Sequence, residues 1–324
     1  MKSYYPSKFW ANCQQYITKF SLLVMATFAL LFLNPQSAQA YPFYAQQTAP
    51  QTPREATGRI VCANCHLAQK PSEVEIPHSV LPNTVFEAIV KIPYDKTAQQ
   101  VLSDGSKSGL NVGAVLMLPE GFTIAPPERI PEELKDKIAD VYYQTYREGA
   151  ENVVLVGPLS GDQHQEIIFP VLSPDPAQNK DIHFGKYSVH LGANRGRGQV
   201  YPTGELTNNN AFKASASGTI ASIEGNSSEG FLVTIANDEG KVTDTIPAGP
   251  DLIVTQGQEV SAGAFLTSNP NVGGFGQKDT EIVLQNPNRI YGLVLFLAGI
   301  MLAQALLVIK KKQVEKVQGA QSVL

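Results

Sequence analysis

The feature that most limits the fold of this chain is an uncharged apolar run near its C-terminus. Residues 290–309 are twenty residues without a charge. As an α-helix rising 1.5 Å per residue, such a run reaches about 30 Å, the thickness of the hydrocarbon core of a bilayer. One arginine precedes the run and the lysines of 310–312 follow it. This asymmetry predicts a transmembrane helix over residues 286–309 and a cytoplasmic tail over 310–324.

A second apolar segment lies near the N-terminus. Lys2, Lys8 and Lys19 precede the apolar run, which covers residues 22–33, and no acidic residue occurs before Glu55. A helix breaker, Asn-Pro, and the small-residue pattern A-Q-A at 38–40 follow. This order is typical of a secretory signal whose apolar region is too short to span a bilayer; an uncleaved anchor is the alternative. We expect residues 1–40 to be removed and Tyr41 to become the N-terminus of an exported domain.

The charge of the exported part differs from that of the whole chain. Residues 41–285 hold 17 Lys and Arg against 28 Asp and Glu, a net charge of −11, whereas the whole chain carries −4. An acidic domain is not typical of nucleic-acid binding. It favours association with a basic or neutral soluble partner, and it also keeps the domain soluble.

The mature chain contains a compact cysteine motif. Cys62 and Cys65 are its only cysteines, and His66 follows the second of them directly. A redox dithiol is usually found at a helix start in a βαβ context, and a zinc site needs two more ligands at suitable spacing. The C-x-x-C-H spacing instead allows two thiols to bond one porphyrin while the histidine binds its iron. The sequence therefore favours covalent haem, outside the cytoplasm.

The residues alone leave the second axial ligand of such a haem open. Met117 is the one methionine of the exported part, although its apolar surroundings are typical of a core strand. The free α-amine of Tyr41 is another candidate, since its pKa of about 8 lets it lose its proton and bind a metal. Other histidines are further candidates: His78, His164, His183 and His190.

Short strands with many turns dominate the rest of the exported part. Apolar residues alternate with charged ones over residues 84–92, and turn-forming residues separate the later candidates. These are residues 112–118, 153–156, 167–172, 186–192, 219–223, 231–236 and 252–255. Residues 41–58 are expected to be irregular, 58–68 to form a short helix carrying the motif, and a helix to start at Pro131. The pattern predicts an all-β sandwich.

Several segments together resemble the cytochrome f family. They are YPFYAQQ after the A-Q-A pattern, GRIVCANCHLA around the cysteines, GRGQVYPTGE at residues 196–205, and the C-terminal span with its trailing lysines. The resemblance covers essentially the whole chain. It implies an elongated immunoglobulin-like or fibronectin-like large domain over 41–209 that continues at 273–285. A small β domain over 210–272 is inserted in it, near a shift to small polar residues, and the glycine-rich stretch at 269–277 is expected to be the exit from that domain.

The resemblance also implies the roles of particular residues. Cys62 and Cys65 would hold one haem c through thioethers, and His66 and the α-amine of Tyr41 would be its axial ligands. An aromatic residue near the N-terminus, Phe43 or Tyr44, would pack near the haem. A buried chain of waters would be lined by residues at the positions of Asn194, Gln199 and Asn209.

The function implied by the resemblance is electron transport in photosynthesis, not catalysis by this subunit itself. Electrons would pass from a Rieske iron–sulfur protein to plastocyanin or a soluble c-type cytochrome, linking photosystem II to photosystem I and supporting cyclic flow. The partners would be cytochrome b6, subunit IV, the Rieske protein and small subunits of a dimeric b6f complex in the thylakoid membrane, with the haem domain in the lumen. The alternatives are a membrane-anchored c-type haem enzyme, such as a reductase or peroxidase, and a structural subunit.

Overall fold

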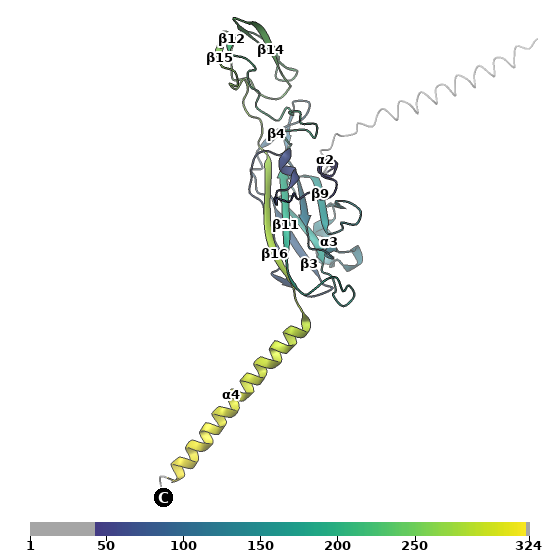
Figure 1. Ribbon diagram of the computed structural model, residues 1–324, viewed down its shortest axis with the longest axis vertical. Helices are drawn as coiled ribbons and strands as arrows, with labels where there is room; N and C mark the ends of the chain where they lie inside the picture. Colours follow the sequence, from purple (N-terminus) through teal and green to yellow (C-terminus); the bar gives the residue numbers. More distant parts are fainter. Residues whose placement is uncertain (1–42, 322–324) are drawn as a thin grey trace, which may run out of the picture. The chain divides into compact units, whose positions relative to one another are not determined.

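Two facing β-sheets form the main body of the chain (Figure 1). The computed structural model describes residues 43–321. The first sheet has the order β1 (Glu73–Glu75), β3 (Val85–Lys91), β10 (Glu166–Leu172) and β7 (Thr123–Ile124). The second has the order β2 (Ser79–Val80), β16 (Gly274–Leu284), β11 (Gly185–Arg195), β6 (Asn111–Met117), β9 (Val153–Ser160) and β8 (Tyr143–Thr145). The prediction of an all-β fold with one C-terminal apolar helix is confirmed.

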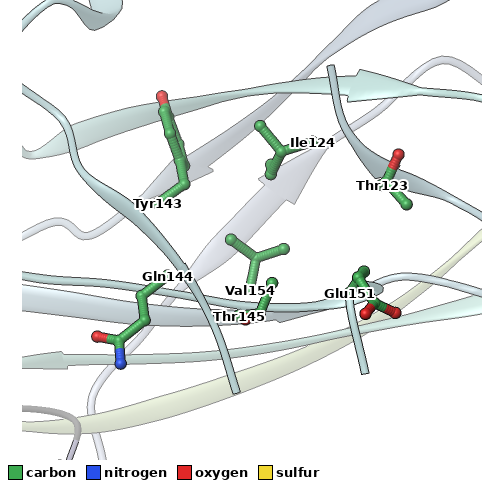
Figure 2. A pocket seen from close by; sticks show the side chains of 7 residues that line it. All are labelled: Thr123, Ile124, Tyr143, Gln144, Thr145, Glu151 and Val154. Carbon is green, nitrogen blue, oxygen red and sulfur yellow. The ribbon is translucent and has the colours of Figure 1, made fainter. Parts of the chain in front are cut away.

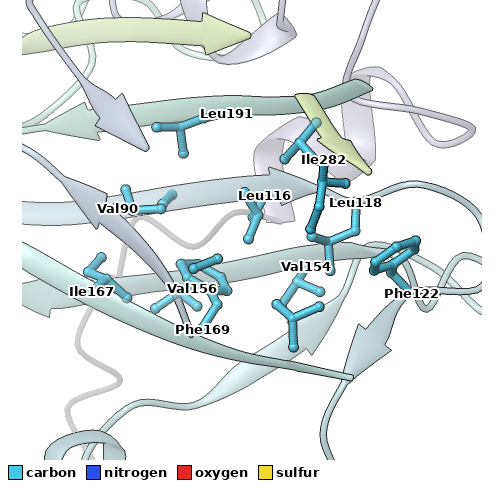
Figure 3. Packing of buried hydrophobic residues seen from close by; sticks show 14 of the residues in the cluster. Val90, Leu116, Leu118, Phe122, Val154, Val156, Ile167, Phe169, Leu191 and Ile282 are labelled. Carbon is cyan, nitrogen blue, oxygen red and sulfur yellow. The ribbon is translucent and has the colours of Figure 1, made fainter. Parts of the chain in front are cut away.

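The core lies between these sheets, as the period-two pattern predicts. In β3 the side chains of Ala88 and Val90 are buried, and Phe86 packs against the same core. They meet β10 residues of their own sheet and residues of the facing sheet, including Leu116, Val154, Leu191 and Ile282 (Figure 3). Because successive strand residues point to opposite faces, one set of alternate positions fills this core.

A smaller sheet has its own core. Its order is β14 (Gly240–Ile246), β13 (Gly230–Asn237), β12 (Gly218–Asn226) and β15 (Glu259–Val260). Its buried cluster comprises Ala214, Ile220, Val233, Ile235, Ile246, Val254 and Leu266. A separate hairpin pairs β4 (Gln99–Val101) with β5 (Lys107–Gly109). The strand predicted at 252–255 is wrong, since only an isolated bridge joins Leu252 to Thr267 there. The domain boundaries at 209 and 273 stay a prediction.

Three further expectations need correction. The segment 41–58 is not wholly irregular, because α2 (Phe43–Thr48) lies within it. The helix expected over 58–68 is a single 3-10 turn, η1 (Val61–Asn64). The glycine-rich stretch expected as an exit is the start of β16, which pairs with β11 over its whole length. Its glycines are needed because the chain after the cysteine motif crosses them: a Cβ on Gly276 would lie 2.2 Å from the carbonyl oxygen of Lys70.

The remaining helices agree more closely with the helices predicted from the sequence. A 3-10 turn, η2 (Pro127–Arg129), precedes α3 (Glu132–Ile138), in which Leu134 and Ile138 are buried. Pro131 caps α3 at its N-terminus, one position before the first helical residue. The C-terminal helix α4 (Pro287–Gln321) is the one helix in the described part of the chain that is long and apolar enough to cross a membrane. It continues beyond residue 309 through the lysine-rich segment.

Candidate haem site

The cysteine motif is folded into one tight turn. Directly after η1, the backbone N–H groups of Cys65 and His66 both donate to the carbonyl oxygen of Cys62, at 3.3 and 3.0 Å. At the start of the turn, Ile60 N–H donates to the side chain of Gln277 on β16 at 3.1 Å. Ile60 itself is fully buried. The turn therefore brings both thiols and the imidazole together on a fixed support.

The two thiols are not activated as a catalytic dithiol would be. Cys62 and Cys65, the cysteines of the described residues, are both free. Burial raises the pKa of Cys62 to about 12 and also raises the pKa of Cys65. Reactive C-x-x-C pairs have lowered thiol pKa values, because the thiolate is the nucleophile. The dithiol interpretation is therefore disfavoured, while thiols held side by side remain suited to bonding one cofactor.

The imidazole of His66 is suited to bind a metal. Burial, with a smaller effect of the Arg195 charge, lowers the pKa of His66 to about 4, so that the ring is neutral at physiological pH. Its Nε2 lies 3.3 Å from the side-chain amide of Asn194, and its Nδ1 is buried with no hydrogen-bond partner. Neutral imidazole is the form that ligates iron. No group of three His, Cys, Asp or Glu side chains within residues 43–321 could form a zinc site instead.

The segment at 196–199 lies directly against the motif. Gln199 N–H donates to the carbonyl oxygen of Cys65 at 2.7 Å, and the Gln199 side chain accepts from Leu67 N–H at 2.9 Å. A Cβ on Gly198 would lie 3.2 Å from the Cβ of Cys65. Gly198 therefore allows the backbone of this segment to lie close to the motif. Leu67 is 56% exposed beside it, an apolar surface that a flat cofactor can cover.

The three predicted water-chain residues occupy different places around this segment. Asn194 contacts His66, and Gln199 is buried against the motif. Asn209 is buried and its side-chain amide donates to the carbonyl oxygen of Arg197 at 2.9 Å. The side-chain oxygen of Asn209 has no hydrogen-bond partner. These positions are compatible with the water-lining role, which stays a prediction.

The N-terminal part of the site is held by a tyrosine that the sequence did not indicate. Tyr41 lies outside the described residues, as does the side chain of Phe43, while Tyr44 is exposed. Helix α2, which follows Tyr41 closely, is tied to the sandwich by Tyr146. The Tyr146 hydroxyl bonds the carbonyl oxygens of Ala45 and Ala49, at 2.9 and 2.6 Å.

The other candidate axial ligands have different surroundings. Met117 packs at the edge of the apolar cluster around Ile60. His164 bonds Asp140 at 3.0 Å and the carbonyl oxygen of Ser160 at 2.9 Å. His190 bonds Asp279 at 2.8 Å. The imidazoles of His164 and His190 are therefore engaged with carboxylates, unlike that of His66.

A cavity of about 220 Å³ lies elsewhere, between the edge strands of the two sheets (Figure 2). Its lining is largely apolar and comprises Thr123, Ile124, Tyr143, Gln144, Thr145, Glu151 and Val154. None of the motif residues lines it. The cavity is thus separate from the candidate haem site.

Comparisons with known proteins cover most of the chain. Residues 41–196 match the family model "Apocytochrome F, N-terminal" and residues 208–323 match "Apocytochrome F, C-terminal". Proteins named cytochrome f are similar over nearly their full length. The one from Microcystis aeruginosa is 71% identical over 95% of both chains, and that from Rippkaea orientalis is 71% identical over 97% of both. The one from Synechocystis sp. is 65% identical over 96% of both. With its C-x-x-C-H turn on a β-sandwich and these matches along the chain, the protein belongs to the cytochrome f family.

Proposed function

We propose that this protein is the membrane-anchored c-type cytochrome of a cytochrome b6f complex. It accepts electrons from a Rieske iron–sulfur protein and passes them to plastocyanin or a soluble c-type cytochrome. The observation that carries the proposal is the turn at Cys62–His66, in which two unactivated thiols lie beside a neutral imidazole. Family membership supports the assignment over the whole chain.

The residues have distinct roles in this proposal. Cys62 and Cys65 form thioether bonds, which hold one haem c in both oxidation states. The His66 imidazole and the α-amine of Tyr41 are the axial ligands. A haem c bound in this way supplies one-electron redox chemistry. The protein contributes the fixed turn, the sheet behind it and the segment at 196–199 that excludes water from one side.

Two nitrogen ligands leave no position on the iron for a substrate. The proposal is therefore for an electron carrier rather than a haem enzyme, although the complex as a whole would oxidise plastoquinol. A reductase or peroxidase needs an open coordination position, so this alternative predicts binding of carbon monoxide by the reduced protein. That difference gives a direct test between the two functions.

In this proposal the haem domain lies in the lumen of the thylakoid. The signal-like residues 1–40 and the lysines after the apolar run of α4 support this orientation. Cytochrome b6, subunit IV, the Rieske protein and small subunits would be the partners in a dimeric complex. The acidic charge of residues 41–285 favours an acceptor that is basic or weakly charged.

N-terminal sequencing combined with haem spectroscopy tests the proposal. We expect the mature protein to begin at Tyr41, to show a c-type haem spectrum after denaturation, and to bind no carbon monoxide when reduced. A mature chain that keeps its leader would exclude the Tyr41 amine as a ligand. Rapid binding of carbon monoxide would support the haem-enzyme alternative.

A further inference from the structure

Arg195 is an arginine buried in the interior of the sandwich. It is the last residue of β11, paired with Gly274 of β16 and Val112 of β6, and its exposed fraction is 0%. Side chains along a strand point alternately to opposite faces. Asn194 contacts His66 on one side, so Arg195 shares the other side with Leu191, a residue of the sandwich core.

The guanidinium has few partners and no counter-ion. One of its terminal nitrogens, Nη2, donates to the carbonyl oxygen of Pro71, whereas Nε and Nη1 are buried without a hydrogen-bond partner. No carboxylate among residues 43–321 forms an ion pair with it. Burial lowers the pKa of Arg195 to about 10, so the group is still charged at physiological pH. A buried charge without a counter-ion is costly, and such a group is a candidate for a functional role.

The nearest electrostatic partner of Arg195 does not neutralise it. The hydroxyl of Tyr94 is buried without a hydrogen-bond partner and interacts with the arginine charge. Burial and the charge of Asp162 raise the pKa of Tyr94, so the Tyr94 hydroxyl is neutral at physiological pH and supplies no negative charge. Asp162 itself is not paired with Arg195. The positive charge therefore acts on its surroundings without local compensation.

This charge lies close to the candidate haem site. Pro71, which accepts its hydrogen bond, belongs to the segment that leaves the motif, only five residues after His66. Asn194, its neighbour in β11, contacts the His66 ring. A positive charge gained at an iron held by His66 would therefore arise close to the guanidinium of Arg195.

We propose that Arg195 sets the reduction potential of the haem, as a fixed buried positive charge beneath the C-x-x-C-H turn. This inference rests on the proposed function. Oxidation adds one positive charge at the iron, so a nearby cation disfavours the ferric state and raises the potential. By Coulomb's law, two unit charges about 12 Å apart at an effective dielectric constant of about 20 change such an equilibrium about tenfold, which sets the order of magnitude expected for a buried charge near the haem. Arg195 acts through its charge and its position, and it is not itself an iron ligand.

The test compares neutral and charged replacements in the full-length protein. R195Q and R195M remove the charge, R195M with an apolar side chain suited to the core, and R195K keeps the charge. R129Q is the matched control, because Arg129 is exposed. Its guanidinium donates two hydrogen bonds to the side-chain and backbone oxygens of Asn83, each of 2.9 Å. Equilibrium redox titrations followed by the haem spectrum give the potential. Each titration is repeated at low and high ionic strength, and unfolding by denaturant is measured for the same variants.

We expect R195Q and R195M to shift the equilibrium with a reference couple about tenfold toward ferric haem, which is about 59 mV for one electron. R195K should stay close to the parent, R129Q should equal it, and the shift should persist at high salt because a buried charge is poorly screened. R195M should resist denaturant at least as well as the parent. Unchanged potentials in both neutral variants, or an equal shift in R195K, would overturn the inference. A parent protein without c-type haem would instead refute the proposed function.

Discussion

The Tyr146 hydroxyl links the N-terminal segment to the sandwich. It bonds two carbonyl oxygens of the α2 segment, those of Ala45 and Ala49, and Tyr146 itself is only 2% exposed. The side chain of Gln46 returns a hydrogen bond to the Tyr146 carbonyl oxygen at 2.6 Å. Because α2 begins two residues after Tyr41, these contacts hold the segment that follows the residue proposed as an axial ligand.

Replacing Tyr146 with Phe removes the hydroxyl and keeps the ring. A hydroxyl has one proton, so we count the loss of one net hydrogen bond, about 1 kcal/mol. The bond from Gln46 to the backbone remains. Opening of the α2 segment should then become about fivefold more frequent, since about 1.4 kcal/mol corresponds to a factor of ten.

The assay is the rate at which the reduced haem protein binds carbon monoxide. Binding requires that the Tyr41 amine leave the iron, so Y146F should bind about fivefold faster than the parent. Y142F is the control, because Tyr142 lies four residues earlier and is 77% exposed. The reasoning would be refuted by a Y146F protein that binds carbon monoxide at the parental rate, or by a Y142F protein that is equally accelerated.

Four further predictions follow from the same features. In C62S/C65S the haem should be extracted by acidified acetone, whereas each single variant should keep one thioether; haem that stays bound to the double variant would exclude thioether attachment. Electron transfer to a basic acceptor should slow as ionic strength rises, and stopped-flow rates that rise with salt would contradict the acidic-surface argument. Burial raises the pKa of Tyr146 to about 12, so this tyrosine ionises in the unfolded chain at a lower pH than in the folded protein. The free energy of unfolding should therefore fall by about 2–3 kcal/mol as the pH rises from about 10 to 12, and denaturant titrations of Y146F should lack this part of the loss. Residues 210–272, which contain a complete small core, should fold alone with a cooperative thermal transition, and a disordered fragment by circular dichroism would refute the proposed boundary.

Local sequence patterns predict many strands of the sandwich. The alternation in β3 predicts its buried face because one side meets the core and the other meets solvent. The same approach misses β16, since glycines replace the alternating apolar residues where the chain after the motif crosses the strand. It also assigns a strand at 252–255, where apolar residues line the small core from a loop.

The residues of the candidate site are likewise predictable from the sequence only in part. Cys62, Cys65 and His66 are adjacent in sequence, so their spacing alone indicates the chemistry. The axial role of Tyr41 rests on family resemblance and stays a prediction. Tyr146 and Arg195 act on the site through tertiary contacts at long sequence separation, and neither belongs to a local pattern that could indicate its partner.

The length of β16 has a consequence for how electrons reach the haem. The strand begins beside the cysteine motif, where Phe275 bonds the segment at Ala68, and ends at Leu284, three residues before α4 begins. At about 3.4 Å per residue, this single strand spans about 34 Å, and its pairing with β11 along all of that length makes it a stiff spacer. The distance between the candidate haem site and the first residue of α4 therefore cannot exceed the length of this strand and of the short link that follows it. An electron donor in the membrane would therefore have to deliver its electron within this distance of the first residue of the helix.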